Sequence, residues 1–205
     1  MVATAKVRRT QAERRDETRR QLLDATVECL VELGYARTST LEVQKRAGVS
    51  RGALLHHYPS KAELLVAAVR HLAELRGDEL TSRAAALPDG GDRVDAVMDL
   101  LWESSTGPLF YVAMELRTAA RTDPELRAVL ADEERRLRRD ILVVSRELFG
   151  EPIASRPGFD EVLEMSINLM MGAAMTVVLH DKHARLDALL RRWKRCFAAM
   201  LEDET

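Results

Sequence analysis

Residues 48–65 decide the fold of this chain, and they read GVSRGALLHHYPSKAELL. Within this stretch, Gly48 tolerates a positive φ, and the hydroxyl of Ser50 can accept a hydrogen bond from the first backbone amides of a following helix. Pro59 ends that helix, because proline lacks the N–H that a helix interior needs. The stretch therefore predicts a short helix over residues 51–57 that begins directly after a tight turn.

Capping signals also define the helices on both sides of this short helix. Ser39 and Glu42 have the spacing of a capping box, and so do Ser60 and Glu63, because in each pair a serine precedes a glutamate by three residues. The first box begins a helix of about two turns that ends near Ala47, and the second box begins a longer helix. Two helices joined by a tight turn that contains glycine have the dimensions of a helix-turn-helix.

The rest of the sequence also favours helices. Aromatic residues make up only 4% of the 205 residues, whereas Ala, Leu, Glu and Arg are abundant. Apolar residues recur at helical spacing, and Gly and Pro interrupt the pattern. We expect an all-α fold of about nine helices, which cover approximately residues 18–33, 40–47, 51–57, 61–76, 94–106, 109–121, 124–149, 159–180 and 185–202.

Charge divides the chain into a basic end and an acidic body. Residues 1–61 hold 12 Lys and Arg against 7 Asp and Glu, a net charge of +5, whereas the remainder holds 19 against 26, a net charge of −7. Residues 1–17 have little apolar periodicity and are rich in arginine, so we expect a flexible basic arm there. A basic end suits a protein that contacts phosphate, although a solvated charged face is the alternative interpretation.

Residues 48–65 closely resemble the DNA-binding signature of the tetracycline-repressor (TetR) family of transcription regulators. The preceding Gly34-Tyr35 and Thr38-Ser39-Thr40 are also similar to that family, so the resemblance covers about Arg20 to Leu65. It implies a helix-turn-helix DNA-binding domain over residues 18–62 and a helical ligand-binding and dimerisation domain over residues 63–205. The implied function is that of a ligand-responsive regulator, a repressor, which binds palindromic double-stranded DNA as a homodimer and is released by a small apolar effector.

The resemblance and the chemistry of the side chains together give a set of DNA-binding residues. Arg51 at the start of the short helix can bond guanine bidentately, and Gly52 permits a close approach of the backbone. Hydroxyl, imidazole and ammonium groups around it can bind phosphates. The predicted set is Ser39, Thr40, Ser50, Arg51, Gly52, Ala53, Leu55, His56, His57 and Lys61. Leu55 stands where similar proteins usually carry tyrosine, so either His56 replaces that hydroxyl or the affinity for DNA is lower. The alternative is that the serines are only caps and Arg51 only a solvated charge.

Two apolar sets in the body follow from the same resemblance. The last two helices are expected to pair with those of a second chain as a four-helix bundle, through Ile167, Met171, Ala174, Val178, Leu186, Leu190, Trp193 and Phe197. Soft and aromatic side chains in the middle helices are candidates to line an effector pocket, namely Met98, Trp102, Phe110, Tyr111, Met114 and Met171. For both sets, the core of a single chain is the alternative.

The composition favours a soluble, cytoplasmic protein. The first twenty residues carry charges throughout and lack the apolar segment of a secretory signal peptide. The longest apolar stretch, residues 167–179, is shorter than the roughly 20 residues that a membrane-spanning helix needs. Cys29 and Cys196 have neither the number nor the spacing of a disulfide framework or a zinc motif.

Enzyme motifs are missing from the sequence. It contains no Gly-rich phosphate loop, no Gly-x-Ser-x-Gly and no His-Glu-x-x-His, so we expect no catalytic residue, no enzymatic activity and no cofactor. His180 and His183, one helical turn apart, are a weak signal for a metal, and we assign no metal site. A sequence-neutral architectural DNA-binding protein is one alternative function, although it predicts a basic body. A helical bundle that binds a metal or a small molecule is another.

Overall fold

The computed structural model describes residues 10–87, 91–178 and 184–203, and over these residues it contains helices and no strand. The all-α prediction is therefore confirmed. The helices are α1 (Gln11–Arg37), α2 (Thr40–Ala47), α3 (Arg51–His57), α4 (Lys61–Ala84), α5 (Gly91–Ser105), α6 (Pro108–Ala120), α7 (Pro124–Phe149), α8 (Glu151–Ala154), α9 (Phe159–Val177) and α10 (Ala184–Asp203).

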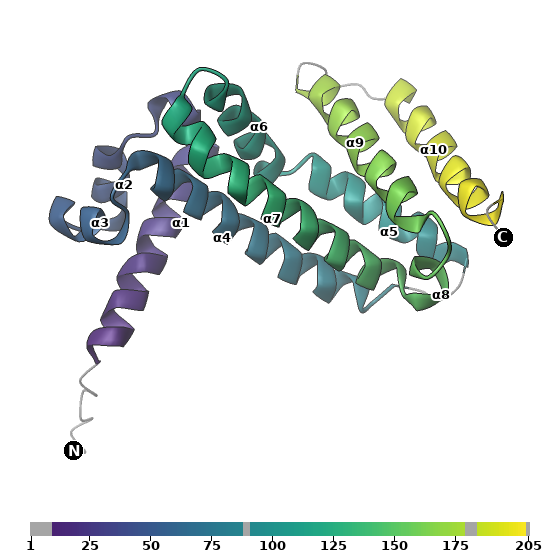
Figure 1. The fold of residues 1–205 in the computed structure, drawn as a ribbon, viewed down its shortest axis with the longest axis horizontal. Coiled ribbons are helices and arrows are strands. Elements are labelled where there is room, and N and C mark those ends of the chain that lie inside the picture. Colours follow the sequence, from purple (N-terminus) through teal and green to yellow (C-terminus); the bar gives the residue numbers. More distant parts are fainter. Residues whose placement is uncertain (1–9, 88–90, 179–183, 204–205) are drawn as a thin grey trace.

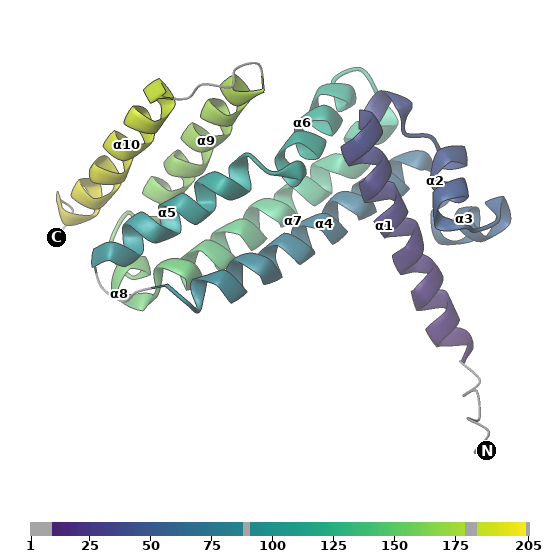
Figure 2. The same cartoon turned by 180° about the vertical axis from the view of Figure 1, so that it is seen from behind.

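Two long helices, α4 and α7, run side by side through the molecule (Figure 1). At one end of this pair lie α1, α2 and α3, and the first half of α1 projects away from the rest. At the other end lie α8, α9 and α10. The view from behind shows α5 and α6 on the second side of the pair (Figure 2), and both helices contact α4 and α7. The α4–α7 pair therefore joins the two ends of the molecule.

Buried apolar side chains form two cores. The first core contains residues of α1, α2, α3, α4 and α6 and of the start of α7. Leu22, Leu54 and Leu116 are fully buried in it. The second core joins α5, α8, α9 and α10 with the end of α7, where the ring of Phe149 stacks on that of Phe197 at a centroid distance of 5.1 Å. Because the first core continues from the helix-turn-helix into the body, the division of the chain after residue 62 stays a proposal about function.

The helix boundaries around the short helix α3 follow the capping signals in the sequence. Ser39, Ser50 and Ser60 each accept a hydrogen bond from the backbone amide three residues later, at 3.2 Å. Gly48 ends α2 in the left-handed conformation with φ +67°. Gly34 has φ +75°, which breaks the regular helix of α1 where a C-cap was predicted.

The predicted start of the first helix is wrong. It begins at Gln11 and not at residue 18, because Thr10 and Glu13 form a reciprocal capping box: Thr10 Oγ1 accepts from the amide of Glu13 at 3.2 Å, and the Glu13 carboxylate accepts from the amide of Thr10 at 2.7 Å. Residues 11–17 of the predicted arm are thus helical, and its first nine residues lie outside the described part of the chain.

Two further differences lengthen the helical content. α4 continues to Ala84, beyond the predicted end near residue 76. The predicted loop over residues 150–158 contains the one-turn helix α8, in which Pro152 occupies an early position where its missing N–H costs nothing. This turn is the helix that the sequence prediction lacks in its count of about nine.

Two glycine substitutions test this account of the backbone. Gly34→Ala should lower the free energy of unfolding by more than about 1 kcal/mol, because the conformation at φ +75° disfavours a side chain. A Cβ there would also meet the Glu115 carboxylate at 3.1 Å, which accepts a hydrogen bond from the amide of Tyr35. Gly77→Ala is the matched control in the interior of α4, where nothing lies within 4 Å, and it should stabilise by roughly 0.5–1 kcal/mol. Urea unfolding at one fixed protein concentration measures both changes, and a fully stable Gly34→Ala variant would contradict the backbone assignment.

Candidate DNA-binding interface and effector pocket

The helix α3 is held in place by its inner face and presents its outer face to solvent. Leu54 is fully buried in the first core. Arg51, Gly52, Leu55 and His56 are exposed, at positions one turn apart on the opposite side of the helix. Burial of Leu54, together with the capped turns at Ser50 before α3 and at Ser60 before α4, thus fixes the direction in which the outer side chains of α3 point.

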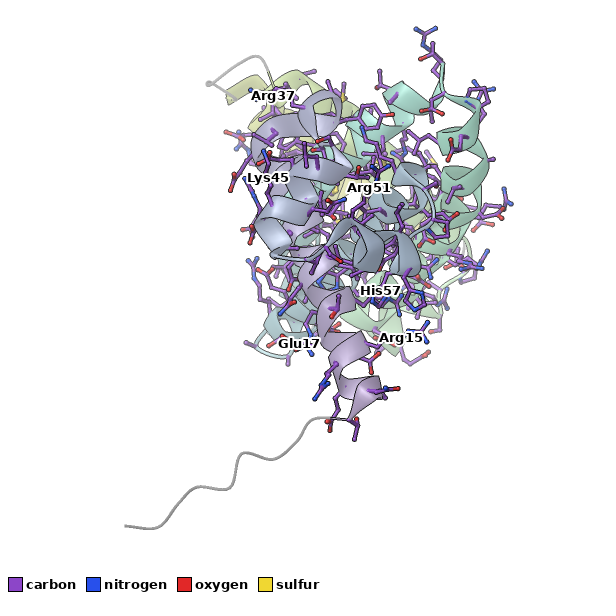
Figure 3. The ribbon with its side chains drawn as sticks, turned by 90° about the vertical axis from the view of Figure 1, so that its left-hand side faces the viewer. Arg15, Glu17, Arg37, Lys45, Arg51 and His57 are labelled. Carbon is purple, nitrogen blue, oxygen red and sulfur yellow. The ribbon has the colours of Figure 1, made fainter. Side chains whose placement is uncertain are left out.

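Basic side chains gather around this outer face. Figure 3 looks onto the end of the molecule that carries α1, α2 and α3, and it shows Arg37, Lys45, Arg51, His57 and Arg15 distributed down that end. Arg37, Lys45 and Arg15 were not among the predicted DNA-binding residues. Leu41 and Lys45 are both exposed and lie one turn apart on α2, and this pattern indicates the outer side of that helix.

The predicted serine contacts have a structural role as caps. The hydroxyls of Ser39 and Ser50 each accept a hydrogen bond from an amide of their own helix. A hydroxyl that accepts in this way still has a hydrogen to donate, so capping and phosphate binding are compatible. Thr40 is the first residue of α2 and is partly buried.

Lys61 lies against neighbouring helices. Its ammonium group is 4.8 Å from the centre of the Tyr35 ring, and the Tyr35 hydroxyl donates to Asp123 at 3.3 Å. Burial lowers the pKa of Lys61, while the carboxylate of Asp123 opposes that change. Lys61 thereby links the start of α4 to α1 and to the cap of α7, and its contact with phosphate stays a prediction.

A cavity of about 480 Å³ lies between α4, α5, α6, α7 and α9. Its apolar wall consists mainly of Leu101, Leu109, Phe110, Ala113, Leu137, Ile141, Val144, Ile167, Met170 and Met171. Charged side chains from α4, α6 and α7 complete the lining, among them Arg70, Arg117 and Glu133. The size and the mixed lining suit a small molecule with a large apolar part and a few polar groups.

Ion pairs connect the helices that border this cavity. Arg70 of α4 binds Glu133 of α7 through two N–H groups on one edge of its guanidinium group: Nε donates to Oε1 at 2.8 Å, and Nη2 donates to Oε2. The Glu133 side chain is buried with only 7% of its area exposed, and its hydrogen bond to Arg70 raises the pKa of the guanidinium. Arg117 of α6 binds Glu134 of α7 at 2.6 Å. Both pairs therefore fix α7 to the helices opposite it, beside the cavity.

Comparisons with known proteins place this geometry in a family. Residues 22–68 match the family model described as bacterial regulatory proteins, tetR family. An uncharacterised HTH-type transcriptional regulator from Mycobacterium tuberculosis is 31% identical over 167 residues, which cover 82% of this chain and 86% of that protein. CymR, an HTH-type transcriptional regulator from Pseudomonas putida, is 34% identical over 171 residues, which cover 82% of this chain and 83% of that protein. The chain belongs to the TetR family of transcriptional regulators.

Solved structures agree with this fold. A TetR transcription regulator from Haloarcula marismortui superimposes with a TM-score of 0.65 at 18% identity, covering 92% of this chain and 98% of that one. The multidrug binding protein EbrR, solved with imidazole, gives a TM-score of 0.59 at 21% identity, covering 88% and 93%. The relatives of this TetR-family chain are transcriptional regulators, which agrees with the prediction that it is not an enzyme.

The cavity of this TetR-family protein involves only part of the predicted pocket set. Phe110 and Met171 line it. Met98 is fully buried in the second core and Trp102 packs against that core, so both belong to the alternative interpretation as core residues. Tyr111 and Met114 are not part of the lining, because α6 turns Phe110, Ala113 and Arg117 toward the cavity. These four residues lie outside the lining of this cavity, and their contact with an effector stays a prediction.

The predicted dimer set is divided between the inside and the outside of the chain. Ala174, Leu190 and Phe197 are buried within the chain, and the Trp193 indole donates to Ser166 at 2.9 Å. Ile167 and Leu186 pack against the second core, and Met171 lines the cavity. Of the eight residues, Val178 is the one with a largely exposed side chain. Other large apolar side chains that face outward from α9 and α10 are Met165, Met175 and Leu189.

Two sequence predictions concern features outside this geometry. His180 and His183, the weak metal signal, lie outside the described residues. Within the described part of the chain, no group of three or more His, Cys, Asp or Glu side chains could hold a metal ion. None of the described helices combines the length and the apolar character that a membrane crossing requires.

The Arg70–Glu133 pair can be tested by removing one partner or both. Arg70→Ala should destabilise the protein by about 1–3 kcal/mol, because it leaves the buried Glu133 carboxylate without its charged partner. The double variant Arg70→Met, Glu133→Leu should recover most of that loss, since no buried charge remains. Arg135→Ala, which breaks the exposed pair with Asp132, is the control and should change stability by less than about 1 kcal/mol. Equal effects of Arg70→Ala and Arg135→Ala on the free energy of unfolding in urea would show that the Arg70–Glu133 pair contributes no more to stability than an exposed pair.

Proposed function

We propose that this TetR-family regulator binds a palindromic operator as a homodimer, through α2 and α3, and that a small and largely apolar effector releases it. The observation that carries the proposal is the outer face of α3, which is anchored from inside by Leu54 and surrounded by basic side chains at one end of the molecule (Figure 3). The acidic body beyond residue 61 favours a regulator over a sequence-neutral architectural protein.

The side chains of α3 divide into base readers and phosphate contacts. The seven-residue helix is short enough to enter the major groove by its first turn, where Arg51 meets base edges. Gly52 and Ala53 leave room for the backbone to approach. Leu55 is exposed and apolar, so it offers a contact to a thymine methyl group in place of a hydroxyl contact.

Two substitutions separate base reading from phosphate binding. Arg51→Ala should weaken binding to the selected operator by about 1–3 kcal/mol, or roughly 5- to 150-fold, and should relax the base preference at the contacted position. Lys45→Ala, an exposed cation on α2, should instead weaken binding equally for all sequences and reduce the salt dependence. Fluorescence anisotropy on operator and scrambled duplexes measures both. A wild-type protein that does not distinguish operator from scrambled DNA would refute the proposed function.

The proposed dimer interface lies at the end of the molecule opposite α3. Outward-facing apolar side chains on α9, at its C-cap and on α10 are about half exposed, namely Met165, Met175, Val178 and Leu189. Exposed apolar side chains on neighbouring helices are typical of an interface between chains. A two-fold axis through this end would present two copies of α3 to half-sites about 34 Å apart.

A matched pair of leucines tests this interface. Leu189→Asp on α10 should raise the dissociation constant of the dimer at least tenfold, because it places a charge inside the proposed apolar contact. Leu75→Asp on α4 is the control, since Leu75 is 52% exposed and Leu189 is 46% exposed. Sedimentation equilibrium measures the dimer population. A wild-type protein that is monomeric at micromolar concentration, or equal effects of the two substitutions, would count against the interface.

The cavity supports the effector part of the proposal. α4 begins at the helix-turn-helix and, nine residues later, contributes Arg70 to the cavity wall. A molecule that fits better when α4 and α7 move apart would favour a dimer whose recognition helices no longer match the two half-sites. A regulator from Saccharomonospora viridis, whose fold matches with a TM-score of 0.59 at 17% identity over 91% of this chain and 96% of that one, was solved with choline. Such complexes support a small-molecule site in this fold.

Selection of genomic fragments on the purified protein would identify the operator. The genes beside the selected fragments then indicate the chemical class of the effector and supply compounds for testing. A compound that binds both arrangements of the dimer equally would not release DNA, whatever its affinity. Recovery of random fragments would favour the architectural alternative.

A further inference from the structure

A second concave surface lies between the beginning of α1 and the end of α3, and we call it the α1–α3 groove. It encloses about 670 Å³ and is lined by Arg15, Asp16 and Arg19 from α1 and by His56, His57 and Tyr58 from α3 and its cap, together with the first two residues of α1. The effector cavity and the base-reading residues Arg51 and Gly52 do not contribute to it. The groove is therefore separate from the effector cavity, and it adjoins the predicted DNA-binding site, with which it shares His56 and His57.

The α1 side of the groove is not explained by core packing. Residues 10–16 are all exposed, and the first side chain of α1 that is fully buried is Leu22. The helix is nevertheless extended to Gln11 by the capping box at Thr10. Arg19 connects this segment to the end of α3, because its Nε donates to the Tyr58 hydroxyl at 3.3 Å. These first turns of α1 thus form a wall of the groove without a core of their own.

The groove concentrates positive charge. Arg15, Arg19, His56 and His57 line it, against the single carboxylate of Asp16. Over the described residues, neither Arg15 nor Arg19 has a carboxylate within ion-pair distance, whereas Arg20 on the same helix pairs with Glu17 at 3.3 Å. Two guanidinium groups without counter-charges, on the wall of a groove, are suited to bind an anion.

The position of the groove indicates which anion. In Figure 3, Arg15 and His57 lie on the same side of the molecule as Arg51 and Lys45, and further toward the beginning of α1. A duplex that receives α3 in its major groove continues past that side. We propose that the α1–α3 groove binds backbone phosphates of the operator that lie outside the base pairs read by α3. This proposal rests on the proposed function, and it extends the DNA contact from the helix-turn-helix to the first turns of α1.

A phosphate in this groove would also take up a proton. His57 faces His56 and Tyr58 on its own segment and Arg15, Asp16 and Arg19 on α1. In the free protein, burial together with His56, Arg15 and Arg19 lowers the pKa of His57, so this imidazole is neutral at pH 7. A phosphate beside it favours the imidazolium and raises that pKa. The contribution of His57 to binding is therefore greatest at low pH and is lost as the pH rises through the pKa in the complex.

Salt dependence provides the test. In the double variant Arg15→Ala, Arg19→Ala, the slope of log K against log salt should be less steep by about 0.9 for each lost phosphate contact, or about 1.8 in total. The rank order of operator sequences should stay the same, because phosphates carry no base identity. Arg20→Ala is the control on the same helix and should leave the slope unchanged. Arg15→Ala alone, which does not disturb Tyr58, should reduce the slope by about 0.9.

A shortened duplex and a change of pH complete the experiment. An operator duplex trimmed to the base pairs read by α3 should bind wild type and double variant with the same affinity, since the flanking phosphates are absent. His57→Gln should remove the gain in affinity between pH 8 and pH 6. An unchanged slope in both arginine variants, or an unchanged difference on the trimmed duplex, would overturn the groove proposal while specific operator binding persists. Loss of operator discrimination by the wild type would instead overturn the proposed function.

Discussion

The packing of α4 against α7 is the constraint on which the rest of the structure depends. It includes the ion pair between the partly exposed Arg70 and the buried Glu133, and it connects a core that contains the helix-turn-helix with a core that contains α9 and α10. Because α4 starts at the DNA end and borders the cavity from Arg70 onward, a displacement at the cavity reaches α3 through one continuous helix. The ammonium group of Lys61 lies over the ring of Tyr35 and holds the start of α4 to α1. The amide of Tyr35 donates to Glu115 and holds the break in α1 to α6.

This ion pair is a poor way to gain stability, because the cost of removing the Glu133 carboxylate from water offsets most of its attraction to Arg70. Its position gives it a different use. An apolar contact between α4 and α7 would tolerate small displacements, whereas a bidentate guanidinium–carboxylate pair has one favourable geometry. An effector with a polar group near Arg70 or Glu133 would compete for the same hydrogen bonds. The arrangement is therefore suited to two discrete positions of α4, which is what a population shift between two dimer states requires.

The sequence predicted the helix-turn-helix best, because its boundaries are written by single residues such as Gly48, Ser50 and Pro59. It failed where position depends on how a helix is rotated. On α9, Ala174 is fully buried and its neighbour Met175 is exposed, and both are apolar, so hydropathy alone could not separate the core from the outer face. The same limit applies to Met98 in the core and Met171 on the cavity wall. The start of α1 was missed for another reason. Its capping box at Thr10 precedes two turns with no apolar stripe, and the prediction relied on that stripe.

The distance between the two proposed contacts with other molecules explains why rigidity matters in this fold. The helices α9 and α10, which carry the outward apolar side chains, lie in the half of the molecule far from α3 (Figure 1). In the proposed dimer, the spacing of the two recognition helices is therefore set at the end far from the DNA. A small rotation at the dimer end becomes a larger displacement at α3, because the whole length of the molecule acts as the arm. Continuous packing through both cores keeps the spacing of the two recognition helices defined. The cavity lies where the two cores meet, since its lining includes residues that pack against each of them. A small molecule bound there can therefore change the spacing with the least disruption of buried contacts.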